Sequence, residues 1–481
     1  MLRTAAKCII QPRNFVKNNK YSNSKNSIRR NYHFLHRQDG RSTNNIRLGA
    51  TQRIAMRLST FHQSTNGSNE FLPLAGITLV GAASLFGYNY TNNTLMEEEV
   101  KIEETKGDSS NEPTRMYTRN EILYSQESKD IRNLADQLQE HFLLTLNNYI
   151  DTTKKEDWNG IKWERDQGVH GGGIRYQQVN SELFHRATIN VSGVHYEDKE
   201  RYPIDSATAL SVILHPKNPY APSMHFHISY VETRSAEKEN YWRMIADLNP
   251  SISNVNDTEK FESNFKTINH MTPELLDDAL EFGNMYFYIP ALKRHRGTSH
   301  LFIGNLNSQD MSKENGKELA EDLAKKTIKR YASIVKNAIA AHPSNSLTVT
   351  DYEQQLYFHT VYFFQVLTLD RGTTHGLLAH SDNDVGTLGS LPNFVDKKLL
   401  SKWKESIDSD VQQQLLQQII DLLPGDEIKN GVKGNVVDDN LRSKIANVVR
   451  KHYRGNRGAT SKQANLNLKW WEEQRNKRLS N

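Results

Sequence analysis

Runs of β-branched and aromatic residues, with apolar and polar side chains alternating in places, occupy the middle of this 481-residue chain. Alternation with a period of two is typical of strands that bury one face. Short connections often join these runs, and short connections favour antiparallel neighbours. The pattern therefore predicts a large, mostly antiparallel β-sheet. The runs lie at residues 185–195, 209–214, 224–232, 300–306 and 358–369.

Apolar residues at helical spacing flank these runs and predict amphipathic helices over the sheet. The segment from about Thr118 onward contains no internal repeat and no long linker rich in Pro, Gly or Ser. We therefore predict one α+β domain, residues 118–450, whose sheet is flanked by helices on both faces. The helical positions are Ile131, Leu134, Leu138, Phe142 and Leu146, then Leu319, Leu323, Ile328 and Ile334, then Leu415, Ile419, Leu422 and Leu423.

The basic charge of the chain is concentrated at its amino end. The formal net charge is +5, and the first sixty residues carry thirteen Lys and Arg side chains against one acid, Asp39. A leader that is rich in Arg, Asn and Ser and poor in acids is typical of a mitochondrial presequence. Residues 1–69 are therefore predicted to be a presequence, and the alternative is a disordered basic tail.

A hydrophobic segment without charged residues follows the leader. Residues 71–88, FLPLAGITLVGAASLFGY, are about long enough to cross a hydrocarbon core of roughly 30 Å. Together with the leader this resembles a bipartite sorting signal, so residues 70–90 are predicted to be a transmembrane or sorting segment. The alternative is a buried core helix. The acidic, polar residues 91–117 predict a solvated linker.

Several chemistries find no support in the sequence. The one cysteine, Cys8, lies in the leader, so the mature protein has no disulfide and no thiolate-held metal or iron–sulfur centre. The motifs GxGxxG, HExxH, GxSxG and the Walker loop are absent from the sequence. The sequence therefore predicts neither a nucleotide cofactor, nor a metal, nor a serine nucleophile.

The densest group of polar and aromatic residues is SVILHPKNPYAPSMHFHISYVE, at 211–232. A strand breaks there at a proline-rich turn and resumes with His225 and His227, whose spacing places both imidazoles on one face. Two histidines at this spacing are either a metal-binding pair or structural residues hydrogen-bonded within a sheet.

Two further segments place charged residues beside apolar runs. In ADLNP, Asp247 follows an aromatic pair and is either a catalytic carboxylate or a cap or turn residue. In LDRGT, the apolar run VYFFQVLTL, predicted as a strand, ends at Asp370 and Arg371. Arginine is suited to a bidentate grip on a ligand carboxylate, and the alternative is an Asp–Arg pair that closes a turn.

Taken together and in this order, these segments resemble the oxygen-dependent coproporphyrinogen III oxidases, over roughly residues 163–392. The long motif HPKNPYAPSMHF and its coexistence with DRGT make the resemblance specific. The family's fold is a large antiparallel sheet flanked by helices, usually in a homodimer. The matching segments are GGG at 171–173, HPKNPYAPSMHF at 215–226, ADLNP at 246–250, HRG at 295–297, DRGT at 370–373 and SLP at 390–392.

The resemblance implies oxidative decarboxylation of two propionates of coproporphyrinogen III to vinyl groups, which gives protoporphyrinogen IX. Molecular oxygen is the oxidant, and no metal or organic cofactor takes part. Three residues match the family's catalytic positions. Asp247 matches an aspartate that holds the pyrrole N–H groups, Arg371 matches a propionate-binding arginine, and His225 matches a histidine with an acid/base role.

The chain departs from the family pattern at several places. Most members continue the histidine motif as HFNYRYFE, whereas HFHISYVE here puts His227 and Ser229 in place of an asparagine and a propionate-binding arginine. In residues 297–307, glycine and asparagine replace acids of the family pattern GIGGIFFDDLD. A substrate-contacting Gly-Ser-Arg segment is replaced by Ser381, Asp382 and Asn383.

Loss of two cations weakens the affinity of a site for a polyanion. We expect His227, Lys217 or Arg296 to compensate. The predicted substrate-binding residues are Ser211, His227, Ser229, Arg296, Ser381, Asp382 and Asn383.

The sequence thus predicts a homodimeric oxidase of haem biosynthesis. Its predicted location is the mitochondrial intermembrane space, or the inner membrane facing that space. Residues 71–88 contact the inner membrane if they are retained. The alternative is a non-catalytic relative that binds a porphyrin or another protein, because a family fold does not guarantee the family reaction. Oxidation of a different tetrapyrrole or of an isoprenoid-like acid is a further alternative. No nucleic-acid partner is expected, because the positive charge lies mainly in the leader. Residues 451–481 are predicted to be a basic tail.

Overall fold

The computed structural model describes residues 126–149, 158–196, 204–234, 239–379, 381–456 and 458–459. The predicted presequence, hydrophobic segment and linker lie outside these ranges, as does most of the predicted basic tail. Within the described ranges, every helix is too short or too polar to span a bilayer.

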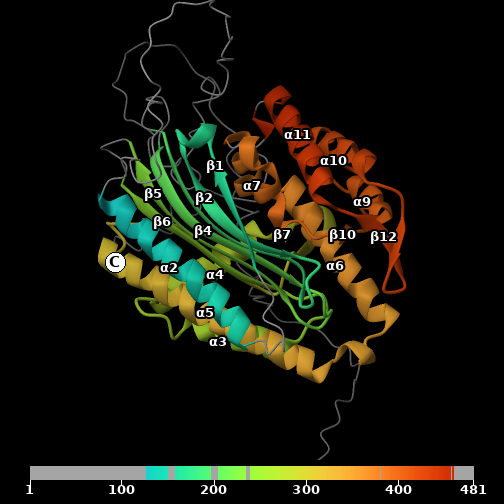
Figure 1. Ribbon diagram of the computed structural model, residues 1–481, viewed down its shortest axis with the longest axis horizontal. Helices are drawn as coiled ribbons and strands as arrows, with labels where there is room; N and C mark the ends of the chain where they lie inside the picture. Colours follow the sequence, from blue (N-terminus) through green and yellow to red (C-terminus); the bar gives the residue numbers. More distant parts are fainter. Residues whose placement is uncertain are drawn as a thin grey trace, which may run out of the picture. The chain divides into compact units, whose positions relative to one another are not determined.

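A sheet of seven antiparallel strands forms the centre of the described structure, in the order β1-β2-β3-β4-β5-β6-β9 (Figure 1). Each strand up to β6 pairs with the next strand in sequence, as the short connections predicted. The strands are β1 Asn159–Glu164, β2 Gly171–Val179, β3 Phe184–His195, β4 Ile204–Pro216, β5 Ser223–Thr233, β6 Tyr241–Asn249 and β9 Ser299–Asn307.

One face of this sheet is covered by long helices. Figure 1 shows α2 (Gln126–Tyr149) and α5 (Lys313–Ala341) running side by side over it, with α3 (Val255–Phe265) beyond them. The helix α4 (Pro273–Tyr286) packs along β9. Alternate strand residues such as Val212, Phe226 and Met244 are buried against these helices. Their burial leaves the intervening residues of each strand on the opposite face.

A second hydrophobic core lies among the helices on the other side of the sheet (Figure 1). A small sheet of three strands, in the order β10-β12-β11, joins them. The main elements are α6 Val349–Thr368, α7 Arg371–Ala379, α9 Lys397–Lys404, α10 Asp410–Leu422, α11 Asp439–Gly455, β10 Phe394–Val395, β11 Glu427–Lys429 and β12 Val432–Val436. The short elements are β7 Tyr288–Ile289, β8 Arg294–His295, α8 Asp384–Thr387 and the 3-10 turns η1 Asp166–Gly168, η2 Pro290–Leu292, η3 Ser344–Ser346, η4 Ser381–Asn383 and η5 Leu388–Ser390.

Buried polar side chains connect the second core to the sheet. Arg186 on β3 donates to the carbonyl of Gly389 at 3.1 Å and to Asp439 at 2.9 Å. His215 on β4 donates to the carbonyl of Ser390 at 2.9 Å. Because these groups are buried, their hydrogen bonds hold the segment after α7 against the sheet.

The α+β class and the antiparallel sheet flanked by helices are confirmed. The predicted helices at 131–146, 319–334 and 415–423 correspond to α2, α5 and α10, and four of the five predicted strands correspond to β3, β4, β5 and β9. The predicted strand at 358–369 is wrong, because these residues belong to α6 and to its end. An apolar run buried on all sides has no visible period, and the helix begins at a capping box formed by Thr348 and Asp351.

Candidate active site on the polar face of the sheet

The sheet face opposite α2 and α5 carries a row of polar side chains, which we call the site face. On β5 it presents His225, His227 and Ser229, as the spacing of the two histidines predicted. Directly opposite residues of adjacent strands lie on the same face. The register therefore places His225 beside Asp247, and Ser229 beside Arg243.

Asp247 lies near the end of β6 and is completely buried. Its Oδ2 accepts hydrogen bonds from Arg296 Nη2 at 2.5 Å and from His225 Nδ1 at 3.1 Å. Its Oδ1 accepts from Asn249 Nδ2 at 2.5 Å and from the backbone N–H of His225 at 3.2 Å. The predicted cap or turn role does not apply, because the residue lies within a strand. Four donors satisfy the carboxylate inside the protein.

Arg296, the cation of this group, follows the short strand β8 and is 1% exposed. Its Nη1 donates to Gln365 of α6 at 2.8 Å. Its guanidinium lies 4.1 Å from the ring centre of Phe287 and 4.6 Å from that of Tyr362. These contacts hold the cation in a fixed position, as cation–π geometry allows.

The electrostatics favour the ionised form of Asp247. Burial by itself raises the pKa of this carboxyl, but the charge of Arg296 and the hydrogen bond from His225 outweigh burial and hold its pKa below the ordinary value. His225 keeps 16% of its side chain exposed while its Nδ1 is held by the carboxylate. A partly exposed imidazole with one nitrogen bonded to a buried carboxylate can transfer protons through its other nitrogen.

His227 lies on the same face but has a different environment. Its Nδ1 is 2.8 Å from the hydroxyl of Ser211 on β4. Burial, and after it the charge of Arg243, lowers the pKa of His227 to about 3. His227 is therefore neutral at physiological pH, so it does not supply the positive charge expected of it.

The other two expected sources of charge are also committed elsewhere. Arg296 pairs with Asp247, as described above. Lys217 donates to the carbonyl of Asn180 at 3.3 Å at an exposed position. The HPKNP motif thus ends a strand and forms a turn, where Asn218 donates to the carbonyl of His342 at 2.6 Å.

The helix α7 brings Arg371 and His375 to the site. Asp370 accepts hydrogen bonds from the backbone N–H groups of Gly372 and Thr373 and from the hydroxyl of Tyr286, which places it as the cap of this helix. Burial and the charge of Arg243 lower the pKa of Arg371. Burial, then Arg371 and Arg243, lower the pKa of His375 to about 4.

The segment Ser381–Asn383 reaches the site face at its other edge. Asn383 Oδ1 accepts a hydrogen bond from Arg175 Nη1 at 2.8 Å. Arg175 lies on β2 directly opposite Asn190, whose neighbour on β4 is Ser211. Asp382 is exposed and accepts from the backbone N–H of Asp166 at 3.2 Å. The structure thus places five predicted residues on one face of the sheet, and Arg296 and Asn383 reach that face through separate hydrogen bonds. The five are Ser211, His225, His227, Ser229 and Asp247.

Arg243 and Arg175 were missed by the sequence reasoning. Both lie in strands, at alternate positions whose side chains lie on the site face. Arg243 and Asp247 occupy two such positions of β6. The alternation within residues 241–249 was a signal that could have found Arg243.

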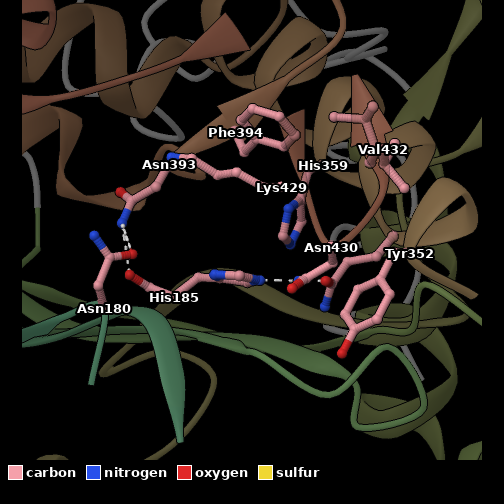
Figure 2. A pocket seen from close by; sticks show the side chains of 11 residues that line it. Asn180, His185, Tyr352, His359, Asn393, Phe394, Lys429, Asn430 and Val432 are labelled. Atoms are coloured by element: carbon pink, nitrogen blue, oxygen red, sulfur yellow. Dashed lines mark hydrogen bonds between the residues drawn. The ribbon is translucent and has the colours of Figure 1, made fainter. Parts of the chain in front are cut away.

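A pocket lies elsewhere, between β3, α6 and the small sheet (Figure 2). Figure 2 shows His185 pointing across it toward α6, where its Nε2 lies 3.2 Å from Gln355 Oε1. His359 also lines this pocket, with Asn180, Asn393 and Lys429. None of the predicted site residues lines it. Among the described residues, no group of three or more His, Cys, Asp or Glu side chains is arranged to hold a metal ion.

Comparison with known proteins gives a consistent family. The sequence model of the family described as coproporphyrinogen III oxidase matches residues 130–420, which is more than half of the chain. The mitochondrial oxygen-dependent coproporphyrinogen-III oxidase of Rattus norvegicus is 29% identical over 269 residues, which cover 52% of this chain and 57% of the relative.

Two further relatives carry the same description. The mitochondrial enzyme of Homo sapiens is 27% identical over 264 residues, covering 50% of this chain and 55% of the relative. The enzyme of Rickettsia akari is 28% identical over 277 residues, which cover 54% of this chain and 93% of the relative. The match thus spans little more than half the length of the mammalian relatives.

Proposed function

Because the chain belongs to the coproporphyrinogen III oxidase family, we propose that it converts two propionates of coproporphyrinogen III to vinyl groups, giving protoporphyrinogen IX in haem biosynthesis. The observation that best supports this proposal is the buried Asp247 carboxylate bonded to His225 on the site face. The proposal uses molecular oxygen as the oxidant and includes no metal or organic cofactor.

Each conversion balances with oxygen alone. A propionate loses CO2 together with a hydrogen and its electron pair from the carbon next to the ring. Molecular oxygen accepts this electron pair and two protons and becomes hydrogen peroxide. One of the two protons is the hydrogen that leaves the carbon next to the ring. The protein's part in this step is to place the substrate and to hold or move a proton.

Within this reaction we assign His225 as the catalytic residue and Asp247 as its positioning residue, in place of the pyrrole-binding role that the resemblance implied for Asp247. Asp247 is 0% exposed and forms an ion pair with Arg296, whereas His225 remains partly exposed on the site face. The carboxylate fixes the orientation of the imidazole, so the exposed edge of the ring faces the bound macrocycle. Arg371 is assigned to a substrate propionate.

The proposed location is the mitochondrion, since the rat, mouse and human relatives are described as mitochondrial and the first sixty residues have a presequence composition. The finer proposal is the intermembrane space or the inner membrane facing it, and a homodimer as the assembly.

Turnover by the full-length chain tests the proposal. Coproporphyrin III is reduced anaerobically to the porphyrinogen and incubated in air, and the vinyl products are followed by chromatography. We expect conversion, and in Asp247→Asn a kcat below about a hundredth of the parent value. KM should change little, because Asp247 does not touch the substrate.

Asp136→Asn, which removes a carboxylate from the far side of the sheet on α2, is the matched control. The rat relative is assayed beside it as a positive control. If the folded chain binds coproporphyrin III but converts no porphyrinogen, the oxidase proposal fails and the porphyrin-binding alternative replaces it.

A further inference from the structure

Arg243 occupies a position on the site face that the family resemblance did not indicate. It lies in β6 directly opposite Ser229, so the two residues share one face of adjacent strands. Its guanidinium lies 5.9 Å from the ring centre of Tyr241, and its side chain is partly exposed. A long cationic side chain at this position reaches over the neighbouring strand.

Arg243 lies near a second cation, Arg371 of α7, and near His375 of the same helix. Its charge contributes to the lowered pKa of both Arg371 and His375. It acts in the same direction on His227. Like charges held close together in a partly buried place disfavour one another, and an anion bound between them removes that repulsion.

Ser229 provides an independent observation at the same spot. It is 5% exposed, and its hydroxyl makes no hydrogen bond among the described residues. In the family pattern this position holds a propionate-binding arginine. Directly opposite residues of antiparallel strands have Cβ atoms about 5 Å apart, which is shorter than an arginine side chain. An arginine at either of the two paired positions can therefore place its guanidinium at the same point above the pair.

We propose that Arg243, together with Arg371, binds a carboxylate of the substrate and thereby replaces, from the neighbouring strand, the cation absent at Ser229. This inference rests on the proposed function, because it takes the ligand to be a tetrapyrrole carrying propionates. Arg243 is then a specificity residue: it favours a macrocycle with carboxylates at its rim over one that has fewer of them.

Binding by the full-length chain tests the inference separately from turnover. Coproporphyrin III, with four carboxylates, and mesoporphyrin IX, with two, are titrated by fluorescence against the parent chain and Arg243→Gln. Loss of one charged hydrogen-bond partner is expected to raise the Kd for coproporphyrin III between about tenfold and about a hundredfold. The Kd for mesoporphyrin IX should rise less.

Two further variants distinguish lost binding from lost structure. Arg132→Gln removes an arginine from α2 on the far face and makes the same change in net charge. The double variant Arg243→Gln, Ser229→Arg returns the guanidinium from the opposite strand and should recover most of the affinity. Recovery is not expected if Arg243→Gln merely distorts the sheet.

The outcomes separate this inference from the oxidase proposal. If the chain lacks turnover but its affinity depends on Arg243 and is rescued by Ser229→Arg, the inference stands and the proposed activity fails. If the chain turns over substrate and Arg243→Gln binds coproporphyrin III as tightly as Arg132→Gln does, the inference fails. Absence of porphyrin binding by the parent chain also overturns it.

Discussion

His225 on β5 and His215 on β4 lie on adjacent strands of one sheet, but one has a charged hydrogen-bond partner and the other has only neutral partners. His225 is bonded to the buried carboxylate of Asp247. His215 donates to the carbonyl of Ser390 and accepts from the hydroxyl of Ser223, which are both neutral groups. The first histidine thus has a charged hydrogen-bond partner, whereas the partners of the second are neutral.

The same contrast extends to the groups around each residue. We call His225, Asp247 and Arg296 the site cluster, and His185, His215 and His359 the histidine cluster. In the histidine cluster the rings pack edge to face, with the centres of His215 and His359 5.5 Å apart. Burial lowers the pKa of His215 to about 3. Buried imidazoles of this kind are neutral packing elements, whereas the site cluster keeps a charge pair in the protein interior.

Breaking the charge pair should have the largest effect. Arg296→Met leaves the carboxylate of Asp247 buried without its cation, which costs about 3 to 5 kcal/mol of unfolding free energy. Urea unfolding followed by circular dichroism measures this change. Combining Arg296→Met with Asp247→Asn should restore part of the loss, because the uncompensated charge is removed. A full loss in the double variant would contradict this account.

Removing the imidazole of the site cluster should affect activity more than stability. His225→Gln is expected to lower kcat roughly a hundredfold, which is about 2.7 kcal/mol of transition-state stabilisation. The matched variant is His215→Gln, which should lower stability but leave kcat per folded molecule nearly unchanged. Equal losses of kcat in the two folded variants would remove the distinction between the clusters.

Acid should act on the two clusters in different pH windows. A histidine whose pKa is lowered by folding binds fewer protons than in the unfolded chain, so its stabilisation is complete above pH 6.5 and is lost as the pH falls toward the folded value. From pH 7 to pH 5, His215 alone should lower the unfolding free energy by about 2 kcal/mol.

The depressed pKa of Asp247 acts in the same direction but at lower pH. Its stabilisation is present above the unfolded carboxyl pKa of about 4 and is lost only below it, so it is retained between pH 7 and pH 5. Urea unfolding at both pH values measures the change, and His215→Asn should reduce it by about 2 kcal/mol. An unchanged pH dependence in that variant would show that His215 is not its source.

The smallest effect is expected for Lys217, the lysine of the motif HPKNPYAPSMHF. The ammonium group of Lys217 is on the surface, where it donates to the carbonyl of Asn180. Lys217→Ala should change the unfolding free energy by less than about 0.5 kcal/mol. KM should also remain within about twofold. A large rise in KM would place Lys217 at the substrate after all.

Much of the site follows from local pattern. The spacing of His225 and His227 placed both on one face, and the strands at 185–195, 209–214, 224–232 and 300–306 were recognised by their composition. The segment 358–369 was assigned to the wrong element. Consecutive residues of this helix, among them Tyr362, Phe363 and Phe364, are all buried, so the helix shows the same unbroken apolar run as a buried strand.

What the sequence determined by itself is therefore local: which residues form strands, and which side chains share a face of one strand. Those properties depend on backbone geometry and on neighbours within a few residues. The tertiary structure decided the rest. Strand register paired His225 with Asp247 and Ser229 with Arg243, and a turn placed Arg296 against the carboxylate. Register and long-range contacts are set by packing of the whole sheet between its helices, so the spacing within any one segment does not encode them.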